Sequence, residues 1–238
     1  MARILPGASP MRQDCGSTSC AVGATEVVVT RLDQPQAAVR TLAALLSGGE
    51  RQRASRFMLD RDRRRFMVAR ARLRQLLAAR LGVRPATIEL TLGARGKPAL
   101  APCCGDSLRF NTSRCGDLAV FAFSRSSEVG IDVEAIRPTP HADDIVAHFF
   151  APPEREAYRA LAPRDRPLGF LNGWTRKEAF IKALGDGLSY PLDRFAVSLA
   201  PGAPARILYV ADPTHAECGW QVESFTPAPG FVAAVVAA

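Results

Sequence analysis

Gly130-Ile131-Asp132-Val133-Glu134 lies near the middle of the 238-residue chain, within a strand that we expect over Val129–Glu134. Branched apolar residues alternate here with carboxylates, which is the period-two pattern of a strand. Because successive side chains of a strand point to opposite faces, we expect Asp132 and Glu134 to share one face, away from the apolar pair. Two neighbouring carboxylates repel each other, so this face favours either solvent or a shared cation.

The elements on the two sides of this strand follow the same order. The first half predicts a strand at Glu26–Thr30, a helix at Ala37–Leu46 that Ser47-Gly48-Gly49 stops, and an amphipathic helix at Asp62–Leu81 that Gly82 closes. Three short strands are then expected, near Thr87–Leu92, Leu108–Asn111 and Leu118–Phe123.

The second half continues from Val129–Glu134 into three helices, expected at Asp143–Phe150, Pro153–Leu161 and Leu168–Leu184. Four strands follow, near Phe195–Leu199, Ala205–Val210, Gln221–Phe225 and Phe231–Val236. The sequence therefore predicts an α+β fold of two similar subdomains packed together, residues 24–125 and 126–238. A lead over residues 1–23, rich in Gly, Ser and Pro, is expected to be disordered.

Composition narrows the class of protein and of partner. The net charge of +8 predicts an anionic partner, such as nucleic acid, an anionic membrane surface or a phosphorylated small molecule. The six cysteines form no Cys-x-x-Cys pair, and the first residues lack the apolar run of a signal peptide. No apolar stretch approaches the roughly 18–20 residues of a membrane span. We expect a cytoplasmic, reduced protein that does not bind a membrane.

Lysine is rare in this chain and occurs in short motifs. The chain has 28 arginines but only three lysines. Lys97 lies in Gly-Lys-Pro, and Lys177 and Lys182 lie in Trp174-Thr-Arg-Lys-Glu-Ala-Phe-Ile-Lys182. Lysine is a compact ammonium that titrates, whereas arginine is a planar fork that stays protonated. The pattern indicates either a codon bias with three chance survivors or positions that need an ammonium.

Glu178 lies on the expected helix Leu168–Leu184, one turn after Trp174 and at the edge of its buried stripe. A carboxylate so close to the core needs a compensating partner. Lys182, four residues on, is one candidate, in the favourable Glu-to-Lys order. The other is a metal shared with Asp132 and Glu134, because carboxylate oxygens are ligands that Mg²⁺ prefers.

A phosphate-binding pattern follows the expected strand Leu108–Asn111. Ser113 and Arg114 place a hydroxyl beside a guanidinium, which grips a phosphate through two charge-assisted bonds. Arginines also crowd the segment before and into the long helix, where most are expected to form a solvated helix face: Arg51, Arg53, Arg56, Arg61, Arg63, Arg64 and Arg65. Neither a P-loop nor a Gly-x-Gly-x-x-Gly motif is present.

With these residues together, the chain resembles a 4′-phosphopantetheinyl transferase of the Sfp-like type, over about Arg53 to Phe195. The resemblance rests on four segments in order: Gly96-Lys97-Pro98, Phe110-Asn111-Thr112-Ser113, Gly130-Ile131-Asp132-Val133-Glu134 and Trp174-x-x-Lys177-Glu178-Ala179-x-x-Lys182. It implies two α/β subdomains related by a pseudo-twofold. It also implies a Mg²⁺-dependent enzyme that moves the phosphopantetheine arm of coenzyme A onto a serine of an apo acyl or peptidyl carrier protein, releasing adenosine 3′,5′-bisphosphate.

The resemblance further implies a role for each matched residue. The magnesium ligands fall on Asp132, Glu134 and Glu178, and the contacts to coenzyme A phosphates on Arg53, Arg65, Lys97, Ser113, Arg114 and Lys182. Catalysis falls on Asp132, Lys182 and Glu178, with Glu178 or a water that it holds as the base for the carrier serine. The carrier belongs to fatty-acid, polyketide or nonribosomal peptide synthesis. Two subdomains in one chain predict a monomer.

One departure from the family pattern leaves alternatives open. The family has histidine after the serine of Asn-x-Ser, and here that position is Arg114. The chain is then either a transferase with altered phosphate contacts or a degenerate coenzyme A binder without turnover. A third reading is a nucleic-acid-binding module that uses the arginine-rich helix, which leaves Asp132, Glu134 and Glu178 without a role.

Overall fold

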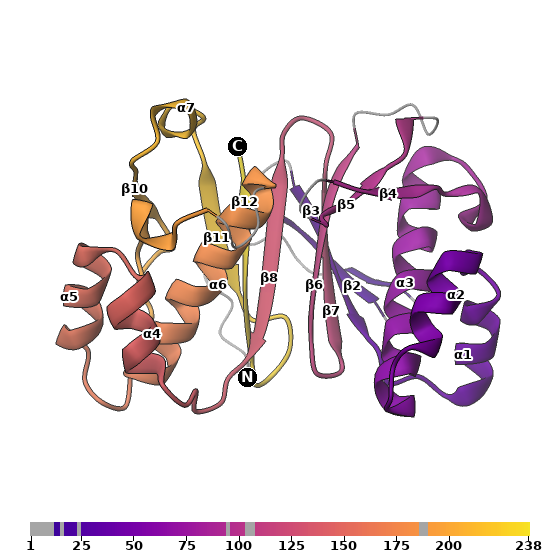
Figure 1. Ribbon diagram of the computed structural model, residues 1–238, viewed down its shortest axis with the longest axis horizontal. Helices are drawn as coiled ribbons and strands as arrows, with labels where there is room; N and C mark the ends of the chain where they lie inside the picture. The colour runs from indigo at the N-terminus through magenta and orange to yellow at the C-terminus, as the bar shows by residue number, and fades with distance from the viewer. Residues whose placement is uncertain (1–11, 15–16, 23–24, 94–95, 103–107, 186–189) are drawn as a thin grey trace.

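The computed structural model describes residues 12–14, 17–22, 25–93, 96–102, 108–185 and 190–238. Figure 1 shows two halves side by side, each with a long helix on the outer side of a sheet, so that strands occupy the middle of the molecule. In the described residues, no helix has both the length and the apolar character to cross a membrane.

The N-terminal half contains an antiparallel sheet with the strand order β1-β2-β3-β7-β6. Its strands are β1 (Arg12–Asp14), β2 (Ser17–Val22), β3 (Thr25–Arg31), β6 (Arg109–Cys115) and β7 (Leu118–Ser124). Strands β1 and β2 contradict the expectation of disorder at their positions, because β2 pairs with the backbone of β3 and β1 pairs with β2, which local composition does not reveal. The rest of the expected lead lies outside the described residues.

The C-terminal half repeats this topology with three strands in the order β11-β12-β8. They are β8 (Val129–Ala135), β11 (Gln221–Phe225) and β12 (Phe231–Ala237). In both halves the first long strand pairs with the last, and the last pairs with the strand before it, always antiparallel. The expected pair of similar α/β subdomains is therefore confirmed as a repeated topology.

Two long helices cover these sheets, α3 (Asp60–Leu81) and α6 (Arg166–Leu184). Each ends at a glycine in the left-handed region, Gly82 as expected with φ 68° and Gly185 with φ 83°, where a residue without a Cβ is unstrained. Shorter helices precede each long one: α1 (Gln36–Ala43) and α2 (Gly48–Ser55), then α4 (Ala142–Phe149) and α5 (Pro152–Ala160).

The segment Ser47-Gly48-Gly49 begins a helix, where the sequence predicted only the end of one. The Ser47 side chain accepts a hydrogen bond from the Glu50 backbone, and the Glu50 carboxylate accepts one from the Ser47 backbone. This reciprocal pair satisfies two backbone N–H groups that the first helical turn leaves free. The Ser-x-x-Glu signal was present in the sequence and outweighs the two glycines.

Short elements connect the main ones. They are β4 (Leu90–Leu92) paired with β5 (Pro98–Leu100), β9 (Phe195–Val197) paired with β10 (Ile207–Val210), and α7 (Pro213–Ala216). The strand expected over Thr87–Leu92 begins only at Leu90, because Pro85–Thr87 form a 3₁₀ turn. The strand expected over Leu108–Asn111 instead runs on to Cys115, which brings Ser113 and Arg114 into the sheet.

Apolar side chains divide into layers that hold the halves together. One face of the N-terminal sheet packs on α1 and α3 through Val28, Phe121 and Leu77. The other face shares a cluster with β8 and β12, in which Val29 and Val120 meet Ile131 and Val235. Because both faces of these strands are buried, their edges are available for polar contacts between the halves.

Gly130 lets α6 approach β8 closely. A Cβ built at this position would collide with the backbone carbonyl of Ala179. The glycine that opens the Gly-Ile-Asp-Val-Glu stretch is therefore a packing requirement, and it sets how near α6 stands to the strand carboxylates.

Candidate functional site

The site forms where two sheet edges meet, β6 of the N-terminal half and β8 of the C-terminal half. Hydrogen bonds from side chains, in place of a ladder of backbone hydrogen bonds, join β6 to β8. The Asn111 side-chain oxygen accepts from the Ile131 backbone at 3.2 Å, and the Ser113 hydroxyl donates to Asp132 Oδ1 at 2.8 Å. Cys115 Sγ then lies 3.5 Å from Glu134 Oε2. Alternate residues of β6 thus meet β8, and Asp132 and Glu134 share one face as expected.

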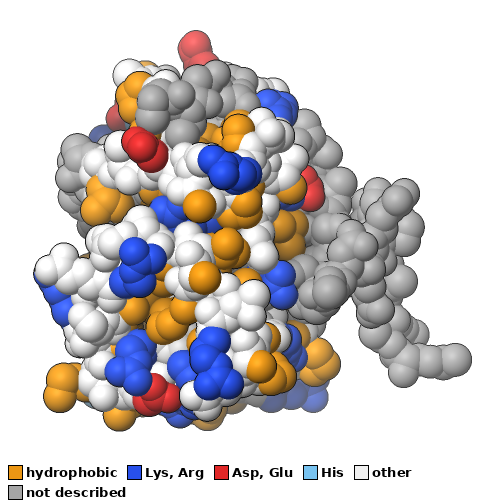
Figure 2. Space-filling model, turned by 90° about the vertical axis from the view of Figure 1, so that its right-hand side faces the viewer, with side chains coloured by type: hydrophobic (Ala, Val, Ile, Leu, Met, Phe, Trp, Pro, Cys, Tyr) orange, Lys and Arg blue, Asp and Glu red, His pale blue; other side chains and the backbone are white. Residues whose placement is uncertain are grey.

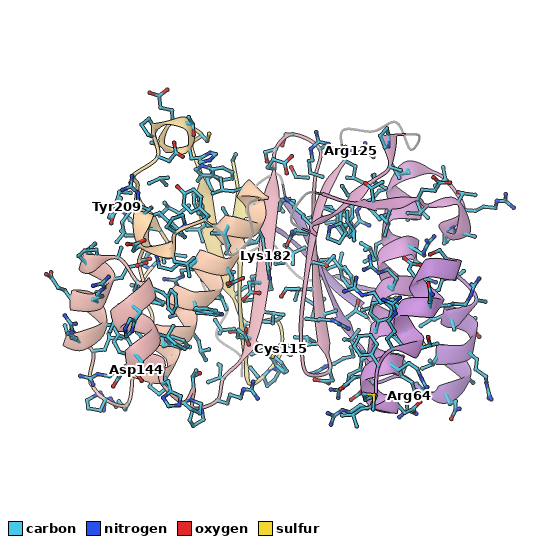
Figure 3. The ribbon with its side chains drawn as sticks, in the orientation of Figure 1. Arg64, Cys115, Arg125, Asp144, Lys182 and Tyr209 are labelled. Carbon is cyan, nitrogen blue, oxygen red and sulfur yellow. The ribbon has the colours of Figure 1, made fainter. Side chains whose placement is uncertain are left out.

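Lys182 of α6 completes this junction from the second element of the C-terminal half (Figure 3). Its Nζ donates to Asp132 Oδ1 at 2.6 Å and to the Ser113 hydroxyl at 3.3 Å. The helix therefore brings an ammonium between a carboxylate and a hydroxyl from the two halves. The fold thus brings residues 113, 132 and 182 into contact.

The carboxylates here lack enough cationic partners. Asp132 is 4% exposed, and its Oδ2 is buried with no hydrogen-bond partner among the described residues. Burial raises the pKa of Glu134 from 4.5, and the neighbouring Asp132 carboxylate raises it further. Burial also raises the pKa of Glu178, although Lys182 opposes this shift. Among the described residues, these three acidic groups share one partly buried space with the Lys182 ammonium, and Arg137 also acts to lower the pKa of Glu134.

These carboxylates suit a divalent cation by their chemistry. Over the described part of the chain, no group of three or more His, Cys, Asp and Glu side chains is gathered as a closed set of metal ligands. Mg²⁺ commonly takes one or two protein carboxylates and completes its shell with water and phosphate oxygens. Asp132 Oδ2, to which no described residue donates a hydrogen bond, lies close to Glu134 and Glu178 and offers such a partial set.

A cavity of about 310 Å³ lies next to this junction and is lined with guanidinium groups. Arg53 of α2, Arg70 of α3 and Arg114 of β6 reach it, together with Ser113. Ser113 therefore belongs both to the cavity and to the Asp132 cluster. The volume is at the lower end of the range for small-molecule sites, and the lining favours an anion.

Two of the expected phosphate contacts have other partners. Both guanidinium ends of Arg65 bind Asp33, at 2.7 and 2.6 Å. Lys97 Nζ donates to Glu128, to the Val129 carbonyl and to the Ala183 carbonyl, each at 3.3 Å. Neither residue is among the described residues that line the cavity. Lys97 instead ties the N-terminal half to the start of β8 and the end of α6.

Lys177 lies away from the acidic cluster, although it is the neighbour of Glu178 in sequence. Its side chain is fully buried, and its Nζ donates to Glu154 at 2.8 Å and to the carbonyls of Leu192 and Phe195. Glu154 in turn accepts from the Val197 and Ala151 backbones. Lys177 therefore joins α5, α6 and β9 inside the C-terminal core.

The arginine-rich segment is largely paired within itself. Arg63 and Arg64 bind Asp60, and Arg61 binds Asp62. Figure 2 shows the face made by the N-terminal helices, where Lys and Arg side chains stand among apolar patches. The expectation of a solvated helix face is confirmed for these three arginines.

Comparison with known proteins assigns the family. A family model described as the 4′-phosphopantetheinyl transferase superfamily matches residues 128–236, and one for the 4′-phosphopantetheinyl transferase N-terminal region matches residues 34–126. The 4′-phosphopantetheinyl transferase HetI of Nostoc sp. is 36% identical over 208 residues, 87% of this chain and 84% of its own. The chain belongs to the 4′-phosphopantetheinyl transferase superfamily.

Two Bacillus subtilis proteins of the 4′-phosphopantetheinyl transferase superfamily are also similar. One 4′-phosphopantetheinyl transferase is 35% identical over 66% of this chain and 68% of its own, and Sfp is 29% identical over 82% and 83%. Superfamily membership makes this chain an enzyme that transfers phosphopantetheine to carrier proteins, with coenzyme A as substrate.

Sequence reasoning missed Arg70 and Cys115. Arg70 follows Ala69 within the amphipathic pattern of α3, so nothing local separates it from the other arginines of that helix. A spacing argument could have found Cys115, because it stands two residues after Ser113, as Glu134 stands two after Asp132.

Proposed function

We propose that the enzyme transfers 4′-phosphopantetheine from coenzyme A to a serine hydroxyl of an apo acyl or peptidyl carrier protein in a Mg²⁺-dependent reaction. The second product is adenosine 3′,5′-bisphosphate. The observation that carries this proposal is the junction of Asp132, Ser113 and Lys182, where a buried carboxylate oxygen has no partner among the described residues and lies beside two glutamates of raised pKa.

The residues present fit a magnesium ion at this junction. Asp132 and Glu178 would hold it with Glu134, since, besides burial, the neighbouring carboxylates raise the pKa of Glu134 and of Glu178, a repulsion that a cation would relieve. When bound, the ion would neutralise charge on the pyrophosphate of coenzyme A. The side chains of the protein itself supply the proton transfer and the fixed positive charge.

In the proposed reaction Lys182 stabilises the charge of the leaving group, and Glu178 accepts the proton of the carrier serine. In the proposed step the serine oxygen of the carrier forms a bond to the phosphorus that bears the pantetheine arm, and the bond from that phosphorus to the bridging oxygen breaks. The electron pair of that bond leaves with adenosine 3′,5′-bisphosphate, whose new charge Lys182 stabilises from a fixed position. The serine proton passes to Glu178, whose raised pKa brings it closer to the range of an effective general base.

The proposal is tested by incubating the protein with coenzyme A, Mg²⁺ and apo carrier proteins from fatty-acid, polyketide and nonribosomal peptide synthesis. We expect at least one carrier to gain the mass of phosphopantetheine, and EDTA to prevent the gain until Mg²⁺ is restored. No gain on any carrier, with the fold verified by circular dichroism, would contradict the proposed transfer. A gain that survives EDTA would remove the metal from the mechanism.

We also propose that the enzyme is a monomer, because both sides of the junction come from one chain. Light scattering after size exclusion should give the mass of a single chain. A stable dimer that dilution dissociates with loss of activity would contradict this.

A further inference from the structure

Cys115 is the last residue of β6 and lies between the two halves of the molecule (Figure 3). Its Sγ stands 3.5 Å from Glu134 Oε2, in the geometry of a hydrogen bond that the thiol donates. We propose that Cys115 is a positioning residue, whose thiol keeps the Glu134 carboxylate in place for the magnesium ion. This inference rests on the proposed function, and it gives a role to a residue outside the motifs that carry the family resemblance.

The contact repeats one that β6 makes with the other carboxylate of β8. Two residues earlier, the Ser113 hydroxyl donates to Asp132 Oδ1 at 2.8 Å. Because the side chains of a strand alternate, Ser113 and Cys115 point to the same side of β6, and Asp132 and Glu134 point to the same side of β8. Each strand carboxylate thus has one oxygen bound by a side chain from the opposite half.

Glu134 depends on its contact from β6 more than Asp132 does. Asp132 is buried and also accepts a hydrogen bond from Lys182 at 2.6 Å. Glu134 is only half-buried, and within the described part of the chain the Cys115 thiol is the group that donates to it. A glutamate side chain has much rotamer freedom to lose, so a single contact decides where its carboxylate lies. Cys115 is therefore the group that restricts Glu134.

The fold also fixes the thiol itself. The Cys115 backbone pairs with Leu118 of β7, and its side chain packs against the apolar cluster that the N-terminal sheet shares with β8 and β12. Groups that hydrogen-bond to a metal ligand commonly change metal affinity about 10- to 100-fold when they are removed. A thiol is a weak donor, so we expect an effect at the lower end of this range.

The test compares Cys115→Ala, which removes the donor, with Cys115→Ser, which keeps one. The matched control is Cys218→Ala, because Cys218 is exposed and its Sγ contacts only the Thr214 carbonyl among the described residues. For Cys115→Ala we expect the Mg²⁺ concentration that gives half-maximal transfer to rise about 10-fold. The kcat at saturating Mg²⁺ and the KM for the carrier should change little. Cys115→Ser and the control should match the unmodified enzyme.

Metal binding without turnover supplies a readout besides activity. With coenzyme A present and no carrier, the decrease in the electron paramagnetic resonance signal of free Mn²⁺ measures how tightly each variant binds the ion. Cys115→Ala should bind Mn²⁺ about 10-fold more weakly than the unmodified protein, and Cys115→Ser should bind it equally well. Should Cys115→Ala fail to fold, Cys115→Val fills the space without a donor, suits a strand and carries the same expectation.

An unchanged Mg²⁺ dependence of Cys115→Ala, or a loss of kcat that excess Mg²⁺ does not restore, would overturn the role of Cys115 while the transferase function stands. Cd²⁺ distinguishes positioning from direct ligation, because thiolates favour soft metal ions. Tighter Cd²⁺ binding by the unmodified protein than by Cys115→Ser would make Cys115 a ligand and overturn the positioning role.

Failure of the proposed function gives a different result. If the unmodified enzyme modifies no carrier, the transferase proposal fails, and the Mn²⁺ titration then decides the role of Cys115 by itself. If the unmodified protein transfers phosphopantetheine but binds no Mn²⁺, the positioning role fails and the transfer stands.

Discussion

Lys177 and Lys182 lie five residues apart on α6 and have opposite environments. Lys177 is 0% exposed and has a complete set of partners, one carboxylate and two carbonyls. Lys182 is 27% exposed and shares Asp132 with Ser113, while Asp132 Oδ2 has no hydrogen-bond partner in the part of the chain that the structure describes. The first arrangement is closed and stabilises the core. The second leaves binding capacity open, which is the condition for a site.

Rotation along the helix produces this difference. Each residue of an α-helix turns by about 100°, so five residues place the two side chains well apart around the axis. One face of α6 looks toward α5 and β9, and the other toward β8 and β6. Glu178, one residue after Lys177, already faces the second side, where Asp132 and Glu134 affect its pKa.

The largest effect is expected from Glu178→Gln, which tests the open side of the helix. We expect transfer to fall about 10²- to 10⁴-fold, because the variant loses a base and a metal ligand, while the fold is retained. Carrier mass gain over time measures the rate. An active, folded variant would remove Glu178 from the mechanism.

Lys177→Met should lower the free energy of unfolding by about 3–5 kcal/mol, because Glu154 is left as a buried charge without its ammonium. Urea unfolding measures this, and transfer by the fraction that remains folded should be nearly normal. The double variant Lys177→Met with Glu154→Gln should recover part of the loss. A stable Lys177→Met protein without activity would reverse the roles assigned to the two lysines.

Lys182→Met should act on rate more than on stability. We expect kcat to fall about 10²- to 10³-fold, the usual cost of removing one fixed donor from a charge-stabilising site. Lys182→Arg, which keeps the charge, should lose less. A loss of stability as large as that of Lys177→Met would show that both lysines serve the core, and the contrast between them would be wrong.

The smallest effect concerns pH. The pKa values of Glu134 and Glu178 are raised from 4.5, so both carboxylates take up protons as pH falls through these raised values, and Mg²⁺-dependent activity should fall with them. The folded state binds these protons more tightly than the unfolded state, so the contribution of both groups to stability decreases as pH rises through the same window. The stability advantage of Glu178→Gln over the unmodified enzyme should therefore grow with pH above 4.5, as urea unfolding at several pH values would show. An advantage that shrinks with pH would contradict the burial of Glu178.

Local patterns predicted much of the fold. The apolar period of α3 and α6, their glycine ends and the alternation in β8 all express short-range preferences that the tertiary structure keeps. Strands β1 and β2 were missed because β2 is supported by pairing with β3, and β1 by pairing with β2. Helix α2 was missed because Gly48 and Gly49 favour a helix end, although Ser47 and Glu50 form a capping box that begins a helix.

The sequence by itself determined which side chains can do chemistry and which of them share a strand face, since both follow from residue type and from the period of two. Only the tertiary structure decided the partners. It paired Lys177 with Glu154, Arg65 with Asp33 and Lys182 with Asp132. It also placed Arg70 beside Arg53 and Arg114 in the lining of one cavity. The physical reason is that burial and long-range packing decide whether a charge is satisfied, and neither is a property of neighbouring residues in the chain.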